Sequence, residues 1–173
     1  MKAWSLLFFI LFTFLSFNLK AQKEPDESTL VRINQPAPNF SFSDQNGQTH
    51  TLNEFRGKVV LLTFFATWCG PCLKELAHLD KEIYEKYKDN PNFVLLVFGR
   101  EHNQSELNDF KNKKAIQFNL LADPKREIYS KYATQFIPRN FIIGKDGKIS
   151  YSSIGFDEDE FENLLNTLNE NLK

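Results

Sequence analysis

The chain contains two cysteines, Cys69 and Cys72, with two residues between them. Thiols at this spacing can form a redox couple, half of a metal site, a structural disulfide or an inert buried pair. A zinc site needs about four ligands, and His50, His78 and His102 are scattered without ligand spacing. A disulfide stabilises most when it closes a long loop, which so short a gap cannot do. A redox couple is therefore the favoured interpretation.

The cysteines stand where a predicted strand meets a predicted helix. The apolar run 58–66 predicts a buried central strand. Apolar residues then recur at helical spacing, at Leu76, Leu79, Ile83 and Tyr87. At the helix start, unpaired N–H groups and the helix dipole favour a thiolate at Cys69, where an inert thiol is not expected. Cys72, one turn further on, is expected to be more buried, so Cys69 attacks and Cys72 resolves the mixed disulfide.

Strands and helices alternate along the rest of the chain. The pattern predicts strands at 92–99 and 118–123, helices at 104–114, 125–133 and 157–171, and hairpins at Asn46-Gly47 and Lys145-Asp146-Gly147. Asp123 and Pro124 are expected to open the helix at 125–133. This order predicts an α/β fold with a central mixed sheet covered on both faces.

The first residues differ from the remainder of the 173-residue chain. Lys2 precedes the uncharged apolar stretch 3–17, and we expect residues 1–21 to be a secretory signal peptide or a membrane anchor. Residues 22–35 are polar and predict a tether, and 36–173 form the predicted domain. The formal net charge is −1, without a basic patch or an acidic tail, so nucleic-acid binding is not expected.

Two motifs carry a resemblance to a known family. "WCGPC" at 68–72 follows a predicted buried strand and opens a helix, and "QFIPRNFII" at 135–143 places Ile137-Pro138 before another strand. The sequence resembles the thioredoxin superfamily, and its exported TlpA/ResA-like thiol-disulfide oxidoreductases in particular. The resemblance implies a thioredoxin fold with an N-terminal β-hairpin and a central insertion before Pro138. It also implies a cis peptide bond at Pro138, which lies against the cysteines.

The same resemblance implies roles for neighbouring residues. The substrate-binding residues that it implies are Trp68, Gly70, Pro71, Ile137, Pro138 and Arg139. Arg139 stands where many relatives have threonine, and is expected to favour an acidic partner or to cap a surface loop. Thr63 stands where small thioredoxins have a buried aspartate. Glu75 is expected either to adjust the cysteine pKa or shuttle a proton, or to be a solvated helix charge paired with nearby lysines.

The direction of electron flow follows from the family pattern. Gly70-Pro71 and Ile137 match thioredoxin, which implies a disulfide reductase recharged by a membrane electron donor. Its partners would be disulfide-containing exported proteins such as apocytochrome c, in the periplasm or at the outer face of the inner membrane, without a metal or other cofactor. The alternatives are a peroxiredoxin-like peroxidase and a redox-inert peptide-binding domain. Leu62 and Ala66 replace the proline and threonine that a peroxiredoxin needs.

Overall fold

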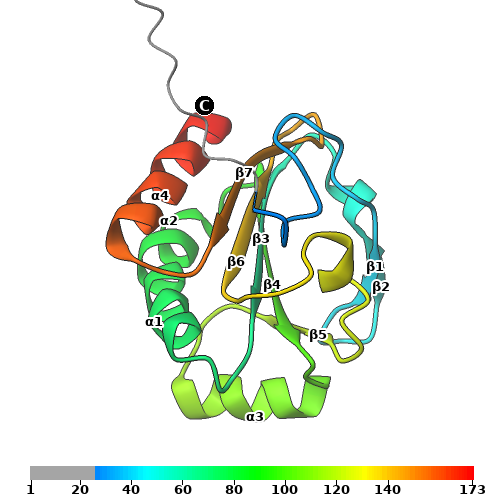
Figure 1. Cartoon of the computed structure of the whole chain (residues 1–173). Helices are drawn as coiled ribbons and strands as arrows, with labels where there is room; N and C mark the ends of the chain where they lie inside the picture. The colour runs from blue at the N-terminus through cyan, green and yellow to red at the C-terminus, as the bar shows by residue number, and fades with distance from the viewer. Residues whose placement is uncertain (1–25) are drawn as a thin grey trace, which may run out of the picture.

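A five-stranded mixed sheet forms the centre of the molecule (Figure 1). The computed structural model describes residues 26–173, so the predicted leader at 1–21 lies outside the described residues. The strands lie in the order β5 (Leu120–Asp123), β4 (Phe93–Arg100), β3 (Val59–Phe65), β6 (Arg139–Ile143) and β7 (Ile149–Ile154). β3, β4 and β5 are parallel, whereas β6 and β7 run antiparallel to their neighbours. The α/β class and the mixed sheet predicted from the sequence are confirmed.

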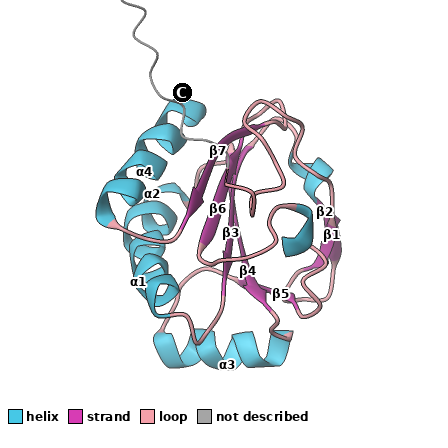
Figure 2. Ribbon diagram, viewed as in Figure 1, coloured by secondary structure: helices cyan, strands magenta, loops and turns pink. Residues whose placement is uncertain are grey.

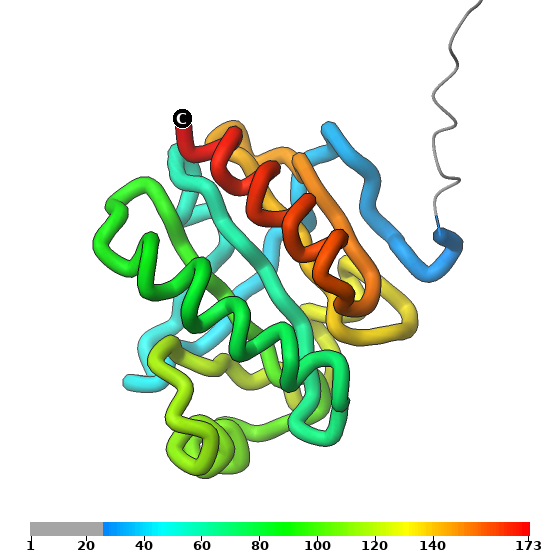
Figure 3. Tube along the Cα trace, turned by 90° about the vertical axis from the view of Figure 1, so that its left-hand side faces the viewer, coloured from blue at the N-terminus to red at the C-terminus, as the bar shows by residue number. Residues whose placement is uncertain are grey.

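The central strand β3 is buried along its whole length, and its side chains alternate between two apolar clusters. Helices cover one of these clusters (Figures 2 and 3). They are α1 (Gly70–His78), the π-helical turn Leu79–Tyr84, α2 (Glu85–Tyr87), α3 (Gln104–Lys114) and α4 (Glu158–Leu172). α1 and α4 lie beside each other over the sheet, so the redox motif at the start of α1 is anchored to the core by a long helical segment (Figure 3). No helix among residues 26–173 is long and apolar enough to span a bilayer.

The opposite face of the sheet is covered by short elements and aromatic rings. β1 (Ser41–Ser43) and β2 (Thr49–Thr51) form the predicted N-terminal hairpin, which leads into the 3₁₀ turn Leu52–Phe55. The Phe40 and Phe42 rings meet the Phe98 ring edge-on, with centroids 5.6 and 5.5 Å away. The hairpin thus closes the face that the longer helices leave open.

The predicted helix at 125–133 is wrong. The chain forms only a 3₁₀ turn, Tyr129–Lys131, in this stretch. Asp123 is buried, and its carboxylate accepts hydrogen bonds from the backbone N–H groups of Ile128 (3.2 Å) and Tyr129 (2.8 Å). Arg126 adopts a left-handed φ of 59°, which interrupts a helix. Asp123 therefore caps a later and shorter turn than the sequence suggested.

The described part of the predicted tether, 26–35, packs on the domain. Thr29 forms an antiparallel bridge with Ala133, and Ser28 is buried. The Arg139 guanidinium donates hydrogen bonds to the hydroxyls of Ser28 and Thr29, the latter at 2.6 Å. Arg139 is fully buried, so its predicted place on a surface loop is wrong: the N-terminal segment covers it.

This packing makes Ser28 important for stability. Ser28→Ala removes a partner of a buried guanidinium and is expected to lower the free energy of unfolding by about 1–3 kcal/mol. Leu30→Ala, a control in the same segment with a half-exposed side chain, is expected to change it by about 0.5 kcal/mol or less. Urea unfolding measures both, and equal losses would contradict the assigned role of the Arg139 contacts.

Candidate active site

Cys69 and Cys72 form a disulfide at the junction of β3 and α1, with a sulfur–sulfur distance of 2.02 Å. Cys69 is the N-cap residue of α1, and its Sγ accepts a hydrogen bond from the backbone N–H of Cys72 at 3.3 Å. Gly70 and Pro71 form the first turn, where proline loses no helical hydrogen bond. The helix start therefore directs an N–H group at the Cys69 sulfur, an arrangement that stabilises negative charge when the disulfide opens.

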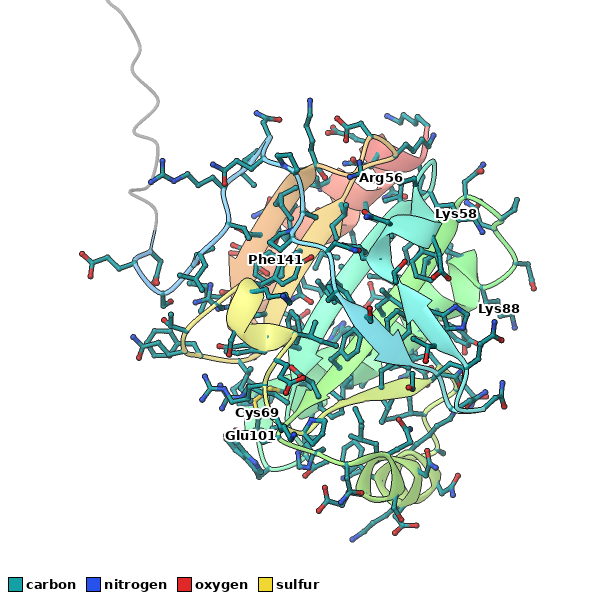
Figure 4. The ribbon with its side chains drawn as sticks, turned by 90° about the vertical axis from the view of Figure 1, so that its right-hand side faces the viewer. Arg56, Lys58, Cys69, Lys88, Glu101 and Phe141 are labelled. Atoms are coloured by element: carbon teal, nitrogen blue, oxygen red, sulfur yellow. A yellow bond between two sulfur atoms is a disulfide. The ribbon has the colours of Figure 1, made fainter. Side chains whose placement is uncertain are left out.

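The two sulfurs differ in exposure. Cys69 is 6% exposed, whereas Cys72 has no exposed surface. Figure 4 shows Cys69 at the end of the sheet remote from Arg56. Cys69 is thus the more accessible of the two sulfurs.

The loop that precedes β6 lies against the disulfide. The Ile137–Pro138 peptide bond is cis, as the resemblance implied. The Ile137 carbonyl oxygen lies 3.7 Å from Cys69 Sγ. The loop is held from two sides: the Tyr129 hydroxyl donates to the Phe136 carbonyl (2.7 Å), and the Gly155 N–H donates to that of Pro138 (2.9 Å). The backbone of Ile137 is thereby fixed beside the reactive sulfur.

Two large apolar side chains near the disulfide are exposed. Trp68 is 66% exposed, and the Arg100 guanidinium lies over its ring, 6.0 Å from the centroid. Phe136, next to Ile137, is 53% exposed. Sequence reasoning missed Phe136, although its place immediately before the Ile-Pro pair is a usable signal. These two side chains, called the apolar rim below, belong to the residues directly before Cys69 and directly before Ile137, whose carbonyl faces the Cys69 sulfur.

Arg139 does not belong to this rim. Its side chain turns toward the N-terminal segment, and its Nη2 also donates to the Gln135 carbonyl at 3.0 Å. Burial lowers the pKa of the guanidinium. The prediction that Arg139 contacts substrate is therefore corrected: the residue holds the cis-proline loop to the N-terminal segment.

Glu75 lies one turn beyond Cys72 on α1 and is 2% exposed. The interpretation of Glu75 as a solvated helix charge is wrong. Burial raises the pKa of its carboxyl to about 8, against the opposing effect of a hydrogen bond from the Asn140 amide. Among residues 26–173 no hydrogen-bond partner reaches its Oε2 atom. Glu75 is thus a proton-holding group in the core behind the disulfide.

Asn140 is the site residue that sequence reasoning missed. It lies in β6 beside Thr63 of β3, whose hydroxyl donates to the Asn140 Oδ1 atom at 2.7 Å. Its only sequence signal is its position two residues after Pro138. In the described part of the chain, no group of three or more potential metal ligands comes together. The site therefore consists of a disulfide, a buried acid and uncharged polar partners.

Glu75 should make stability depend on pH. Between pH 4.5, the ordinary pKa of a glutamate, and about pH 8, the Glu75 carboxyl keeps its proton in the folded state, whereas the unfolded chain has lost it. The free energy of unfolding therefore falls as pH rises through this window, by at most about 1.4 kcal/mol per pH unit. Glu75→Gln keeps the shape of the side chain and removes its titration. The free energy of unfolding of the oxidised variant should therefore equal that of the parent near pH 4.5 and exceed it increasingly toward about pH 8. Urea unfolding across this range tests the expectation, and parallel curves for the two proteins would contradict it.

Known proteins share this fold and motif. The AhpC/TSA family model matches residues 33–152. Thiol-disulfide oxidoreductase ResA of Bacillus thuringiensis (strain Al Hakam) is 32% identical over 125 residues, which is 72% of this chain and 71% of the relative. ResA of Bacillus subtilis (strain 168) is 30% identical over 113 residues, covering 65% of this chain and 62% of the relative.

Solved structures agree. A solution structure from Bacteroides thetaiotaomicron, of a candidate protein disulfide isomerase, has a TM-score of 0.79 and 37% identity, covering 84% of this chain and 92% of that one. A crystal structure from Chlorobium tepidum, of a candidate thiol:disulfide interchange protein DsbE, has a TM-score of 0.71 and 25% identity, covering 83% and 99%. The chain belongs to the AhpC/TSA family and, within the thioredoxin superfamily, to the ResA-like thiol-disulfide oxidoreductases.

Proposed function

We propose that the protein reduces disulfides of exported proteins through a Cys69/Cys72 cycle. The observation that carries this proposal is the asymmetry of the disulfide: Cys69 caps a helix and keeps a small exposed surface, whereas Cys72 is fully buried, one helical turn before a buried acid. Thiolate attack requires an accessible sulfur, and resolution requires only a neighbouring one. The names of the ResA and DsbE relatives support thiol–disulfide exchange without specifying its direction.

The cycle begins with the reduced protein. The Cys69 thiolate attacks one sulfur of the substrate disulfide, and the other substrate sulfur leaves as a thiolate. Cys72 then gives up its proton and attacks the Cys69 sulfur, which releases the second substrate thiolate and leaves the Cys69–Cys72 disulfide. Two electrons have passed to the substrate, and a membrane electron donor returns two to the protein.

Glu75 accounts for the proton in this cycle. Cys72 is sealed from solvent, so its proton needs a carrier within the protein. Glu75 shares its helix face, three residues on. In the fraction of molecules whose Glu75 is ionised, the buried carboxylate is a base strong enough to take the Cys72 proton, and its raised pKa of about 8 then holds that proton at neutral pH. When the electron donor reopens the disulfide, Glu75 returns the proton to Cys72.

The expected location of the protein and its exposed apolar side chains indicate which substrates it would bind. The predicted leader, residues 1–21, would place the domain in the periplasm or at the outer face of the inner membrane, whether it is cleaved or retained as an anchor. Exposed Trp68 and Phe136 would contact apolar side chains that flank a substrate disulfide, and the fixed backbone of Ile137 would align the peptide. Apocytochrome c before haem attachment is the substrate that the ResA-like resemblance implies.

Replacement of Cys69 and replacement of Cys72 should affect the reaction in different ways. Cys69→Ser removes the attacking sulfur and is expected to abolish the reduction of insulin disulfides. Cys72→Ser leaves attack intact but removes resolution, so it should accumulate a mixed disulfide with substrate that mass spectrometry detects. Full activity in both variants, or trapping by Cys69→Ser in place of Cys72→Ser, would contradict the mechanism.

Peroxide is not expected to be a substrate. Leu62 and Ala66 occupy the positions where a peroxiredoxin carries proline and threonine, and Arg139 is bound to the N-terminal segment and not to Cys69. The reduced protein should consume hydrogen peroxide no faster than its Cys69→Ser variant, measured as peroxide loss under identical conditions. Rapid consumption that depends on Cys69 would favour a peroxidase.

A further inference from the structure

A row of three buried polar residues crosses the sheet beneath α1. Thr63 of β3 is paired in register with Asn140 of β6, which is paired with Ser153 of β7. Their exposures are 0%, 1% and 6%. The residues next to this row on the same face, including Leu61, Phe65 and Ile142, belong to the apolar cluster under the helices. Burying a polar group in such a place costs free energy unless the group is hydrogen-bonded, so each donor and acceptor in the row should have a partner.

The Asn140 amide meets Glu75 with its nitrogen and meets Thr63 with its oxygen. The Thr63 hydroxyl donates to Asn140 Oδ1 at 2.7 Å. The Asn140 Nδ2 group then donates to Glu75 Oε1 and, at 3.3 Å, to the Ser153 hydroxyl oxygen. Each hydrogen of the NH₂ group therefore has an acceptor, and the amide oxygen is occupied by Thr63. The amide faces the carboxyl only as a donor.

This arrangement makes the two oxygens of Glu75 unequal. Oε1 accepts from Asn140 whether the carboxyl is neutral or ionised. Oε2, which is buried and has no hydrogen-bond partner in the described part of the chain, is left to carry the proton. A donor to Oε1 also stabilises the ionised form and opposes the effect of burial.

We propose that Asn140, oriented by Thr63, is a positioning residue that places the Glu75 proton on Oε2 and makes the carboxyl easier to ionise. The proposal rests on the proposed role of Glu75 as proton carrier for Cys72. The proposal also assigns a role to Thr63. The Thr63 hydroxyl is uncharged, so it orients the Asn140 amide without adding a second carboxylate beside Glu75.

Few other titratable groups of the described residues lie near Glu75. Cys69 and Cys72 lie on the same helix and are joined in the oxidised protein. Burial is the main cause of the raised pKa of the Tyr151 hydroxyl in β7, and the nearby Glu75 charge adds to it. That hydroxyl donates to Glu160 of α4, both to its side chain and to its carbonyl at 3.1 Å. Asn140 is thus the hydrogen-bond donor that the described residues supply to Glu75.

The titration of Glu75 itself tests this arrangement. The oxidised full-length chain is labelled with ¹³C at the glutamate carboxyls, and the Glu75 signal is identified by its loss in Glu75→Gln. Asn140→Leu keeps the approximate size and removes the donor, so the titration midpoint should rise by about one pH unit, a tenfold change in the acid constant. Thr63→Val frees the amide to turn its oxygen toward the carboxyl, so the midpoint should rise in the same direction.

Ser153→Ala is the matched control. It removes the other acceptor of Asn140 without touching Glu75, and should leave the midpoint nearly unchanged. Unaltered titration in both Asn140→Leu and Thr63→Val would overturn the proposal. If Asn140→Leu does not fold, the Thr63→Val result decides alone.

A second readout separates this proposal from the proposed function. The pH profile of insulin reduction should shift with the Glu75 midpoint in Thr63→Val and Asn140→Leu, which a merely structural role would not produce. If the midpoint shifts but neither these variants nor Glu75→Gln alter the pH profile, the proton-carrier role of Glu75 fails while the positioning by Asn140 stands.

Discussion

The hydrogen bond from the Asn140 amide to the buried Glu75 carboxyl is the constraint on which the arrangement of the site depends. An ionisable group between a helix and an apolar sheet costs free energy, and a hydrogen bond to its charged form offsets part of this cost. In the proposed cycle the carboxyl must stay close to Cys72, because that sulfur is closed to solvent. The sheet must therefore supply a polar partner at that point, which Asn140 does with the help of Thr63.

The same environment bears on the direction of electron transfer. The strong oxidant DsbA owes its high potential to the stability of its reduced form. Here only Cys69 is placed at a helix start, where negative charge is favoured. A thiolate at Cys72 would lie in an apolar core on the same helix face as a carboxyl, and both burial and a like charge disfavour it. Stabilisation of the reduced pair therefore comes from the Cys69 thiolate alone, and we propose that it is weaker than in a strong oxidant.

Much of this site could be predicted because its signals are local. One continuous stretch of sequence holds the cysteine pair, the strand before it and the helix after it. Pro138 could be recognised because the residues around it resemble the cis-proline loop of a known family. Asn140 could not be recognised, because its meaning comes from pairing with Thr63, which is 77 residues away. Arg139 was misplaced for a related reason: the segment that buries it lies more than a hundred residues earlier in the chain. The helix expected at 125–133 failed because Asp123 was read as a local cap, whereas its carboxylate binds N–H groups five and six residues on.

The reduction potential of the Cys69–Cys72 pair, measured by equilibration with glutathione, tests the central claim most directly. A buried, uncharged Cys72 beside Glu75 leaves the Cys69 thiolate as the stabilised group of the reduced form. The expected potential is near that of thioredoxin, about −270 mV. A potential near that of DsbA, about −120 mV, would mean that the reduced pair is strongly stabilised and would contradict the assignment as a reductase.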